Sequence, residues 1–312
     1  MTRQNRQPGL GSSVTYRMRQ GAQSRSIDRP LIYVLLLVMV TAVWGWTFVL
    51  VKDAITQYPT LPFLQLRFAL ALIVMVALVR RLPTRRELWV GLVAGAVLAG
   101  GYVTQTVGLA ATSPGNAGLI TGLFVVFTPL INRFFGAPVH WWTWCAVLGS
   151  LAGIVMLTGG PSGMGIGEIL VLACAVLFAL HIVLLSHWSP SLPAAPLAMV
   201  QMGSSALIFS AAGSWSLGPP SGGVWAAILI TGVFASALAF YIQTWAQAHI
   251  DASRTALILA TEPAWAVVAA VLLAGQRFGP VQAAGAVLVL AAIVGHELAP
   301  LKFKPQHERA QA

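Results

Sequence analysis

Apolar stretches alternate with short polar segments along the chain from residue 31 to residue 298. A helix needs about 20 apolar residues to cross the hydrocarbon core of a bilayer. Strict alternation over about 10 residues, typical of barrel strands, is absent. We therefore predict an all-α integral membrane protein with ten transmembrane helices. The predicted spans are residues 31–51, 62–79, 88–108, 115–135, 140–158, 166–186, 195–213, 223–243, 254–274 and 280–298.

The two halves of the chain carry matching segments. Residues 101–106 read GYVTQT and residues 239–244 read AFYIQT, while Pro129 matches Pro263 at an offset of 134 residues. Five spans per half is an odd number, so the second half crosses the membrane in the opposite sense. We predict two inverted five-helix repeats, residues 31–160 and 161–298, divided at a glycine-proline run. Small-residue pairs at a spacing of four, such as Gly118 and Gly122, are interpreted as helix packing.

The segments outside the spans are polar and basic. Residues 1–30 are rich in Arg, Gln, Ser and Gly, which predicts a disordered N-terminal tail, and residues 299–312 form a second tail. The apolar run 31–51 is too long for a signal peptide and no small-residue cleavage site follows it. It is therefore predicted to be the first span.

Basic residues gather on one side of this topology. Of the 18 Lys and Arg, 15 lie on the side of the termini, Lys52 and Arg277 lie on the other, and Arg67 lies within a span. Cytoplasmic loops carry an excess of Lys and Arg. We therefore predict a plasma-membrane protein with both termini in the cytoplasm. The same placement explains the net charge of +10 without a nucleic-acid partner.

Composition limits the function classes. With 57% hydrophobic and 8% charged residues and a mean hydropathy of +0.80, the chain lacks the polar groups to cover a soluble surface. No Walker A motif is present, which argues against ATP-driven pumping. We assign no catalytic set, metal site, cofactor or disulfide, because Cys145 and Cys174 lie in apolar stretches at no ligand-like spacing.

Inverted repeats are typical of secondary transporters, with a substrate site near the midplane. Glu262 lies about nine residues into its predicted span, which places it about 12 Å from the inner surface. Pro263 beside it frees a backbone carbonyl. An intramembrane carboxylate of this kind binds a substrate amine or carries a proton; the alternative is a buried carboxyl bonded to a neighbouring helix.

Other polar or aromatic residues are candidates for the same cavity. Gln105 and Gln243 occupy equivalent positions beside tyrosines, which suits a small organic ligand, although interhelical hydrogen bonds explain them equally well. His181 corresponds to Thr47 and is a candidate proton relay or a packed residue. The full set of cavity candidates is Glu262, Gln105, Gln243, Trp44, Tyr102, Tyr241, Thr47, His181 and Asn116.

Arg67 lies about 8 Å in from the outer surface. Asp53 is closer to it in depth than Glu262 is, so we favour a structural contact between Arg67 and Asp53, or snorkelling of Arg67 to the membrane surface, over substrate binding. Arg67, Asp53, Pro129 and Pro263 are therefore structural or coupling candidates.

Motifs in several spans resemble one transporter family. Residues 44–52 read WGWTFVLVK and residues 67–71 read RFALA; residues 105–109 read QTVGL and residues 117–123 read AGLITGL, followed by the Glu262–Pro263 pair. Their order and spacing resemble the EamA-like branch of the drug/metabolite transporter superfamily over residues 31–298. The family often has Gly-Glu-Arg after the ninth span, whereas this chain has Gly275, Gln276 and Arg277.

This resemblance implies two EamA-like repeats and transport of small organic molecules, often export of amino acids or other metabolites. We therefore expect a secondary transporter, not an enzyme, that exports amino-acid-like compounds by alternating access. Its partners would be a small-molecule substrate, membrane lipid and protons as the candidate coupling ion. The alternatives are a lipid flippase or scramblase, which needs a laterally open groove, and a membrane-embedded enzyme, for which the chain offers no convergent catalytic set.

Overall fold

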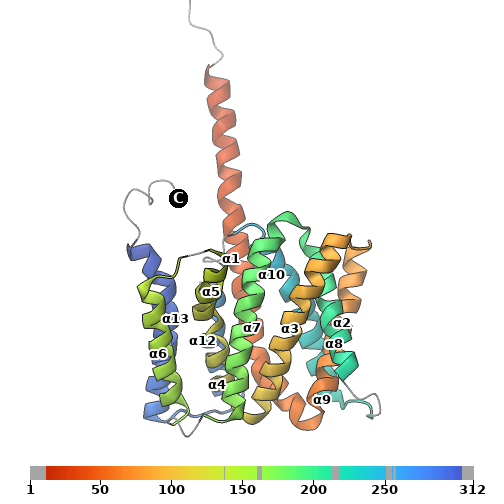
Figure 1. The fold of residues 1–312 in the computed structure, drawn as a ribbon. Coiled ribbons are helices and arrows are strands. Elements are labelled where there is room, and N and C mark those ends of the chain that lie inside the picture. Colours follow the sequence, from red (N-terminus) through yellow and green to blue (C-terminus); the bar gives the residue numbers. More distant parts are fainter. Residues whose placement is uncertain are drawn as a thin grey trace, which may run out of the picture.

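The computed structural model describes residues 12–136, 138–159, 164–212, 218–250, 255 and 258–303. These residues form a bundle of helices, with no strand among them (Figure 1). Helix α3 packs against α7 and α8, α2 packs against α8, and α6 pairs with α13 at one side of the bundle. The helices are α1 (Ser12–Gln57), α2 (Thr60–Val79), α3 (Arg85–Ala111), α4 (Pro114–Thr121), α5 (Phe124–Asn132), η1 (Arg133–Phe135), α6 (Trp141–Leu157), α7 (Ile166–Trp188), η3 (Ser189–Ser191), α8 (Ala194–Ala212), α9 (Gly222–Gly232), η4 (Val233–Leu238), α10 (Ala239–Gln247), α12 (Glu262–Leu272) and α13 (Pro280–Phe303).

Within the described residues, length and composition identify seven helical segments that could cross a membrane: Ile32–Gln57, Thr60–Val79, Arg85–Ala111, Pro114–Phe135, Ile166–Ser191, Ala194–Ala212 and Gly222–Gln247. Three shorter apolar helices accompany them: Trp141–Leu157, Glu262–Leu272 and Pro280–His296. The protein is therefore an all-helical, multi-pass membrane protein. The count of ten spans includes the three shorter helices and stays a prediction, as does the inverted repeat.

The ends of the chain differ in part from the sequence-based expectation. Disorder was predicted for residues 1–30, but from Ser12 onward the chain is helical, and α1 projects beyond the bundle (Figure 1). The physical reason is that nucleation is the costly step in helix formation, so a helix already fixed by its apolar span extends at low cost. Residues 1–11, 160–163 and 304–312, with the predicted boundary between the halves, lie outside the described residues.

Two helices at the centre of the bundle are interrupted. Helix α4 ends at Thr121, and α5 begins only at Phe124. Helix α12 begins at Glu262, so Pro263 occupies its first turn, where the missing N–H costs no helical hydrogen bond. Residues 258 and 259 before this start are also helical, so Pro263 lies just after an interruption and not inside a kinked continuous helix.

Helices α4 and α12 approach each other closely. A Cβ atom added at Gly118 would lie 2.1 Å from Cβ of Ala266, and one added at Gly122 would lie 2.1 Å from Cγ of Pro263. No side chain larger than hydrogen fits at these distances. The interpretation of Gly118 and Gly122 as a packing pair is confirmed.

Lys52 caps the C-terminus of α3. Its Nζ donates to the carbonyl oxygens of Leu109, Ala110 and Thr112 at 2.8, 2.9 and 3.0 Å. The last carbonyls of a helix lack intrahelical donors and carry partial negative charge. A lysine at this position therefore supplies hydrogen bonds and charge to the C-terminus of α3.

Helices α9, η4 and α10 form one continuous rod whose middle part, η4, is a π-helix. The wider turn of a π-helix alters the backbone hydrogen bonding, and here the carbonyl of Ala235 accepts a hydrogen bond from the indole Nε1 of Trp44 at 2.8 Å. The neighbouring Ser236 contacts α2 through Arg67. The π segment thus connects α1 and α2 to the second half of the chain.

Candidate functional site

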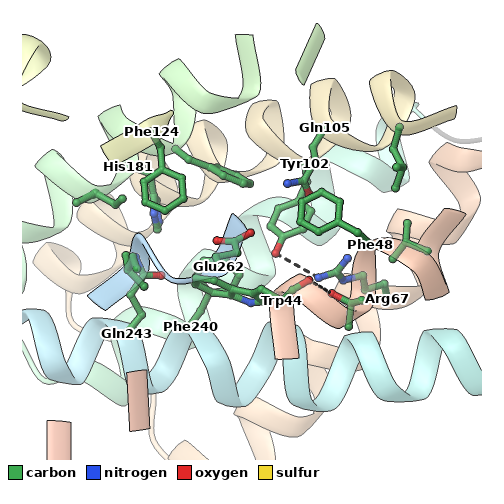
Figure 2. A pocket seen from close by; sticks show the side chains of 16 residues that line it. Trp44, Phe48, Arg67, Tyr102, Gln105, Phe124, His181, Phe240, Gln243 and Glu262 are labelled. Atoms are coloured by element: carbon green, nitrogen blue, oxygen red, sulfur yellow. Dashed lines mark hydrogen bonds between the residues drawn. The ribbon is translucent and has the colours of Figure 1, made fainter. Parts of the chain in front are cut away.

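A cavity lies at the centre of the bundle (Figure 2). About 600 Å³ of space lies between the atoms that line it, and this volume includes space open to solvent. Both halves of the chain contribute to its wall. The lining residues are Trp44, Thr47, Phe48, Val51, Arg67, Tyr102, Gln105, Leu109, Phe124, Phe178, His181, Ile182, Phe240, Gln243, Leu259 and Glu262.

Aromatic side chains make up much of the wall. The rings of Trp44 and Phe240 are 5.3 Å apart, and those of Tyr102 and Phe178 are 5.5 Å apart. Sequence analysis found Trp44 and Tyr102 but missed Phe178 and Phe240. A signal for both existed, because each lies three residues before a polar candidate, His181 or Gln243, and residues three apart share a helix face.

Glu262 points into the cavity from the first residue of α12 (Figure 2). The residue is 4% exposed. Its carboxylate forms no hydrogen bond or ion pair with any residue that the structure describes. The sequence predicted Glu262 about nine residues into its span, beside a proline. The structure places it at the N-terminus of α12, where the partial positive charge favours a carboxylate.

Arg67 lines the same cavity and is 3% exposed. Its Nε donates to Oγ of Ser236 at 2.9 Å and its Nη2 donates to the hydroxyl of Tyr102 at 3.2 Å. The guanidinium carbon also lies 4.6 Å from the centre of the Tyr102 ring, a distance typical of a cation–π contact.

The predicted contact between Arg67 and Asp53 is wrong. Asp53 is exposed, and its Oδ2 accepts a hydrogen bond from Nε2 of Gln57 at 3.2 Å. The prediction of this contact compared only the depths of the two residues in the membrane and not the directions of their side chains. Successive residues of a helix point about 100° apart, so the direction that brings Val51 into the cavity turns Asp53 away from it.

His181 belongs to a buried hydrogen-bond network. Its Nε2 lies 2.7 Å from Oε1 of Gln201. The amide nitrogen of Gln201 donates to the carbonyl of Leu197 at 3.3 Å and to Oγ1 of Thr244 at 3.4 Å. A backbone carbonyl only accepts, so the Gln201 nitrogen faces Leu197 and its oxygen faces His181. In the neutral imidazole, Nε2 therefore carries the proton.

The two equivalent glutamines differ in their hydrogen bonding. Nε2 of Gln105 donates to Oγ1 of Thr121 at 3.3 Å. Gln243 is 2% exposed, and its Oε1 is enclosed without a donor. A buried polar atom without a partner is costly in a folded protein. Gln243 is therefore the member of the pair that is open to a ligand.

The remaining candidates are distributed around the site. Thr47 lines the cavity, and its hydroxyl donates to the backbone carbonyl of Trp44 at 2.8 Å. Tyr241 and Asn116 are half-buried outside the lining, and Pro129 lies inside α5. Pro263 contacts the α4–α5 break at Gly122. The structure thus brings together Glu262, Gln105, Gln243, Trp44, Tyr102, Thr47, His181 and Arg67.

Comparisons with known proteins identify a family and a related transporter. The model of the EamA-like transporter family matches residues 31–159 and again residues 165–296. A protein of Archaeoglobus fulgidus described as an uncharacterized transporter is 31% identical over 264 residues, which cover 83% of each chain.

One solved crystal structure has a similar fold. It matches this chain with a TM-score of 0.64 at 22% sequence identity. The match covers 87% of this chain and 99% of the other. At this identity the likeness concerns the fold alone.

Proposed function

Because the chain belongs to the EamA-like transporter family, we propose that this membrane transporter is a secondary transporter that exports small, amino-acid-like metabolites. The observation that carries the proposal is the central cavity, which holds an unpaired carboxylate and a guanidinium.

The charges of the cavity support an amphoteric substrate. Glu262 and Arg67 both line it and both are buried. Glu262 and Arg67 do not form an ion pair with each other; among the described residues, the ion pair is between Arg81 and Glu87. Buried charges are normally paired. A molecule with an ammonium group and a carboxylate would supply one partner to Glu262 and the other to Arg67.

The interrupted helices support alternating access. Transporters with inverted repeats often bind substrate where helices are discontinuous, and here the α4–α5 break faces the start of α12 beside Glu262. We propose that residues 31–160 and 161–298 act as inverted repeats that rock about the cavity, with protons as the coupling ion. The excess of basic residues places both termini in the cytoplasm in this proposal.

The alternatives fit less well. A lipid flippase needs a polar groove that opens sideways to lipid, whereas this cavity has lining residues from α1, α2, α3, α5, α7, α10 and α12. A membrane enzyme needs a nucleophile or metal near a base. The described residues contain no group of three or more His, Cys, Asp or Glu that could hold a metal.

Transport by the full chain reconstituted in lipid vesicles tests the proposal. A panel of amino acids, amines and sugars would be offered with and without a pH gradient. We expect uptake of one or more amino-acid-like compounds that a pH gradient accelerates. Transport of none of the panel, or movement of labelled phospholipid between leaflets instead, would contradict the proposal.

Replacing Glu262 by Gln tests its role in coupling. We expect Glu262→Gln to abolish the acceleration by a pH gradient, because an amide cannot take up and release the proton. Glu168→Gln is the matched control: Glu168 is also buried, but it accepts bonds from Thr112 and from the backbone of Gly165 outside the cavity. Unchanged pH-gradient dependence in Glu262→Gln would remove Glu262 from the coupling role.

A further inference from the structure

Acceptor groups without donors lie on three side chains in one part of the cavity. They belong to Glu262, Gln243 and His181, which line it together. In Figure 2 the carboxylate of Glu262 points into the cavity, with His181 and Gln243 toward one end of the view and Tyr102 and Arg67 toward the other. Each acceptor has a separate physical reason for being free.

The free acceptor of His181 is its Nδ1. Gln201 fixes the proton on Nε2, because its own amide is oriented by Leu197 and Thr244. The neutral ring then has a bare lone pair on Nδ1. Two other histidines, His187 in α7 and His249 just beyond α10, place Nδ1 against the backbone carbonyl four residues earlier. His181 forms no such bond in the described structure.

The free acceptor of Gln243 is Oε1, which is enclosed and has no donor. The last torsion of a glutamine side chain has a broad energy profile, so the amide can turn this oxygen toward a ligand without moving α10. The carboxylate of Glu262 adds two more acceptor oxygens and a negative charge.

We propose that Glu262, Gln243 and His181 form a site for a primary ammonium group, with Gln201 as the residue that positions His181. A primary ammonium carries one positive charge and three N–H donors, one for each of the three side chains. The inference rests on the proposed transport function and specifies which end of the substrate enters this part of the cavity.

Other ligand chemistries match this site less well. A carboxylate or phosphate brings further acceptors, and the carboxylate of Glu262 repels its negative charge. A hydroxyl brings one donor and leaves the charge of Glu262 uncompensated. A quaternary ammonium would satisfy the charge and contact the aromatic walls of Trp44 and Phe240, but it has no N–H and leaves all three acceptors without donors.

Binding of a methylated amine series tests the proposal. The probes are benzylamine, N-methylbenzylamine, N,N-dimethylbenzylamine and benzyltrimethylammonium, each of which carries one positive charge at neutral pH. Apparent affinities come from thermal unfolding of the full chain in detergent at increasing probe concentration. We expect each added methyl group to weaken binding about tenfold, because each removes a donor from a buried acceptor.

Variants assign the selectivity to individual side chains. Gln243→Leu and His181→Phe should each reduce the preference for benzylamine over N,N-dimethylbenzylamine about tenfold. Gln247→Leu is the matched control, since Gln247 lies one turn further along α10 and is similarly buried. It does not line the cavity, and its amide donates to the carbonyl of Ile182 and the hydroxyl of Ser186. The preference should survive in this control.

A double-mutant cycle tests the positioning role of Gln201. Gln201→Met should reduce the preference in the native background but cause no additional loss in the His181→Phe background, because it acts through His181. Additive losses would show that Gln201 does not act through the imidazole and would overturn this part of the proposal.

Two results would overturn the ammonium site. One is binding of benzyltrimethylammonium as tight as that of benzylamine, which would indicate an aromatic cation site. The other is failure of benzylamine to stabilise the protein at any concentration. The vesicle assay judges the transport function separately, so substrate transport without amine binding would refute the site alone.

Discussion

Arg67 is held by side chains from both halves of the chain, Tyr102 of α3 and Ser236 of the π segment. A buried guanidinium without such partners would be strongly unfavourable. The hydrogen bonds therefore fix the cation at the cavity wall before any substrate is present.

Tyr102→Phe tests the strength of this arrangement. The substitution keeps the ring against Phe178 and removes the hydroxyl that accepts from Arg67. We expect a loss of about 1.5–3 kcal/mol in the free energy of unfolding, as for other hydrogen bonds to charged groups. Unfolding by denaturant in detergent measures it. Tyr241→Phe is the control and should change stability little, because Tyr241 lies outside the cavity lining.

At the residue scale, sequence reasoning found the polar side chains of the cavity but not all of its apolar wall. Glu262, Gln243 and His181 are conspicuous because polar groups are costly in a membrane. Phe124 carries no such signal, since phenylalanine is also stable against lipid. Whether the amide oxygen of Gln243 has a donor depends on its neighbours in space, so it could not be predicted from the amino-acid sequence.

Helix packing around the cavity depends on the close approach of α4 and α12. Gly118→Ala would place Cβ within 2.1 Å of Cβ of Ala266. We expect it to destabilise the protein by about 1–3 kcal/mol, as overpacking does, and to lower its melting temperature. Gly223→Ala has no heavy atom within 4 Å of the new Cβ and should leave the melting temperature unchanged or raise it. Equal melting temperatures for the two variants would contradict the packing argument.

Lys52 offers a second test at this scale. Lys52→Met should lower stability by about 1–2 kcal/mol, because three carbonyls at the end of α3 lose a charged donor. Thermal unfolding in detergent measures the change. Arg277→Met serves as a comparison, since Arg277 is exposed; a loss as large in that variant would argue against capping by Lys52.

The sequence predicted helix positions better than helix interruptions. Spans such as 62–79 and 166–186 fall within α2 and α7, because hydropathy reports where apolar side chains cluster. It does not report backbone conformation. The α4–α5 break and the start of α12 at Glu262 therefore could not be predicted from it, although Pro263 marked the region.

For the whole molecule, the distribution of charge predicts orientation. With 15 of the 18 Lys and Arg on the side of the termini, we expect a reporter fused at the C-terminus to be active only in the cytoplasm. Paired fusions of one cytoplasm-active and one exterior-active reporter measure this. Activity of the exterior reporter alone would reverse the topology and the direction of transport inferred from it.

The π segment η4 changes which side chains share a face in the continuous helix from α9 to α10. Residues 18 apart in a regular α-helix share a face, since 18 residues make five turns of 3.6. In α3 this holds: Glu87 is 2% exposed and Gln105, 18 residues later, also faces inward. In the rod from α9 to α10, Trp225 is 42% exposed and Gln243 is 2% exposed. The wider turn of η4 has rotated everything beyond it. If η4 became a regular α-helix with no change in length, Gln243 would turn by about 100°, out of the cavity and toward the face of the rod that carries Trp225.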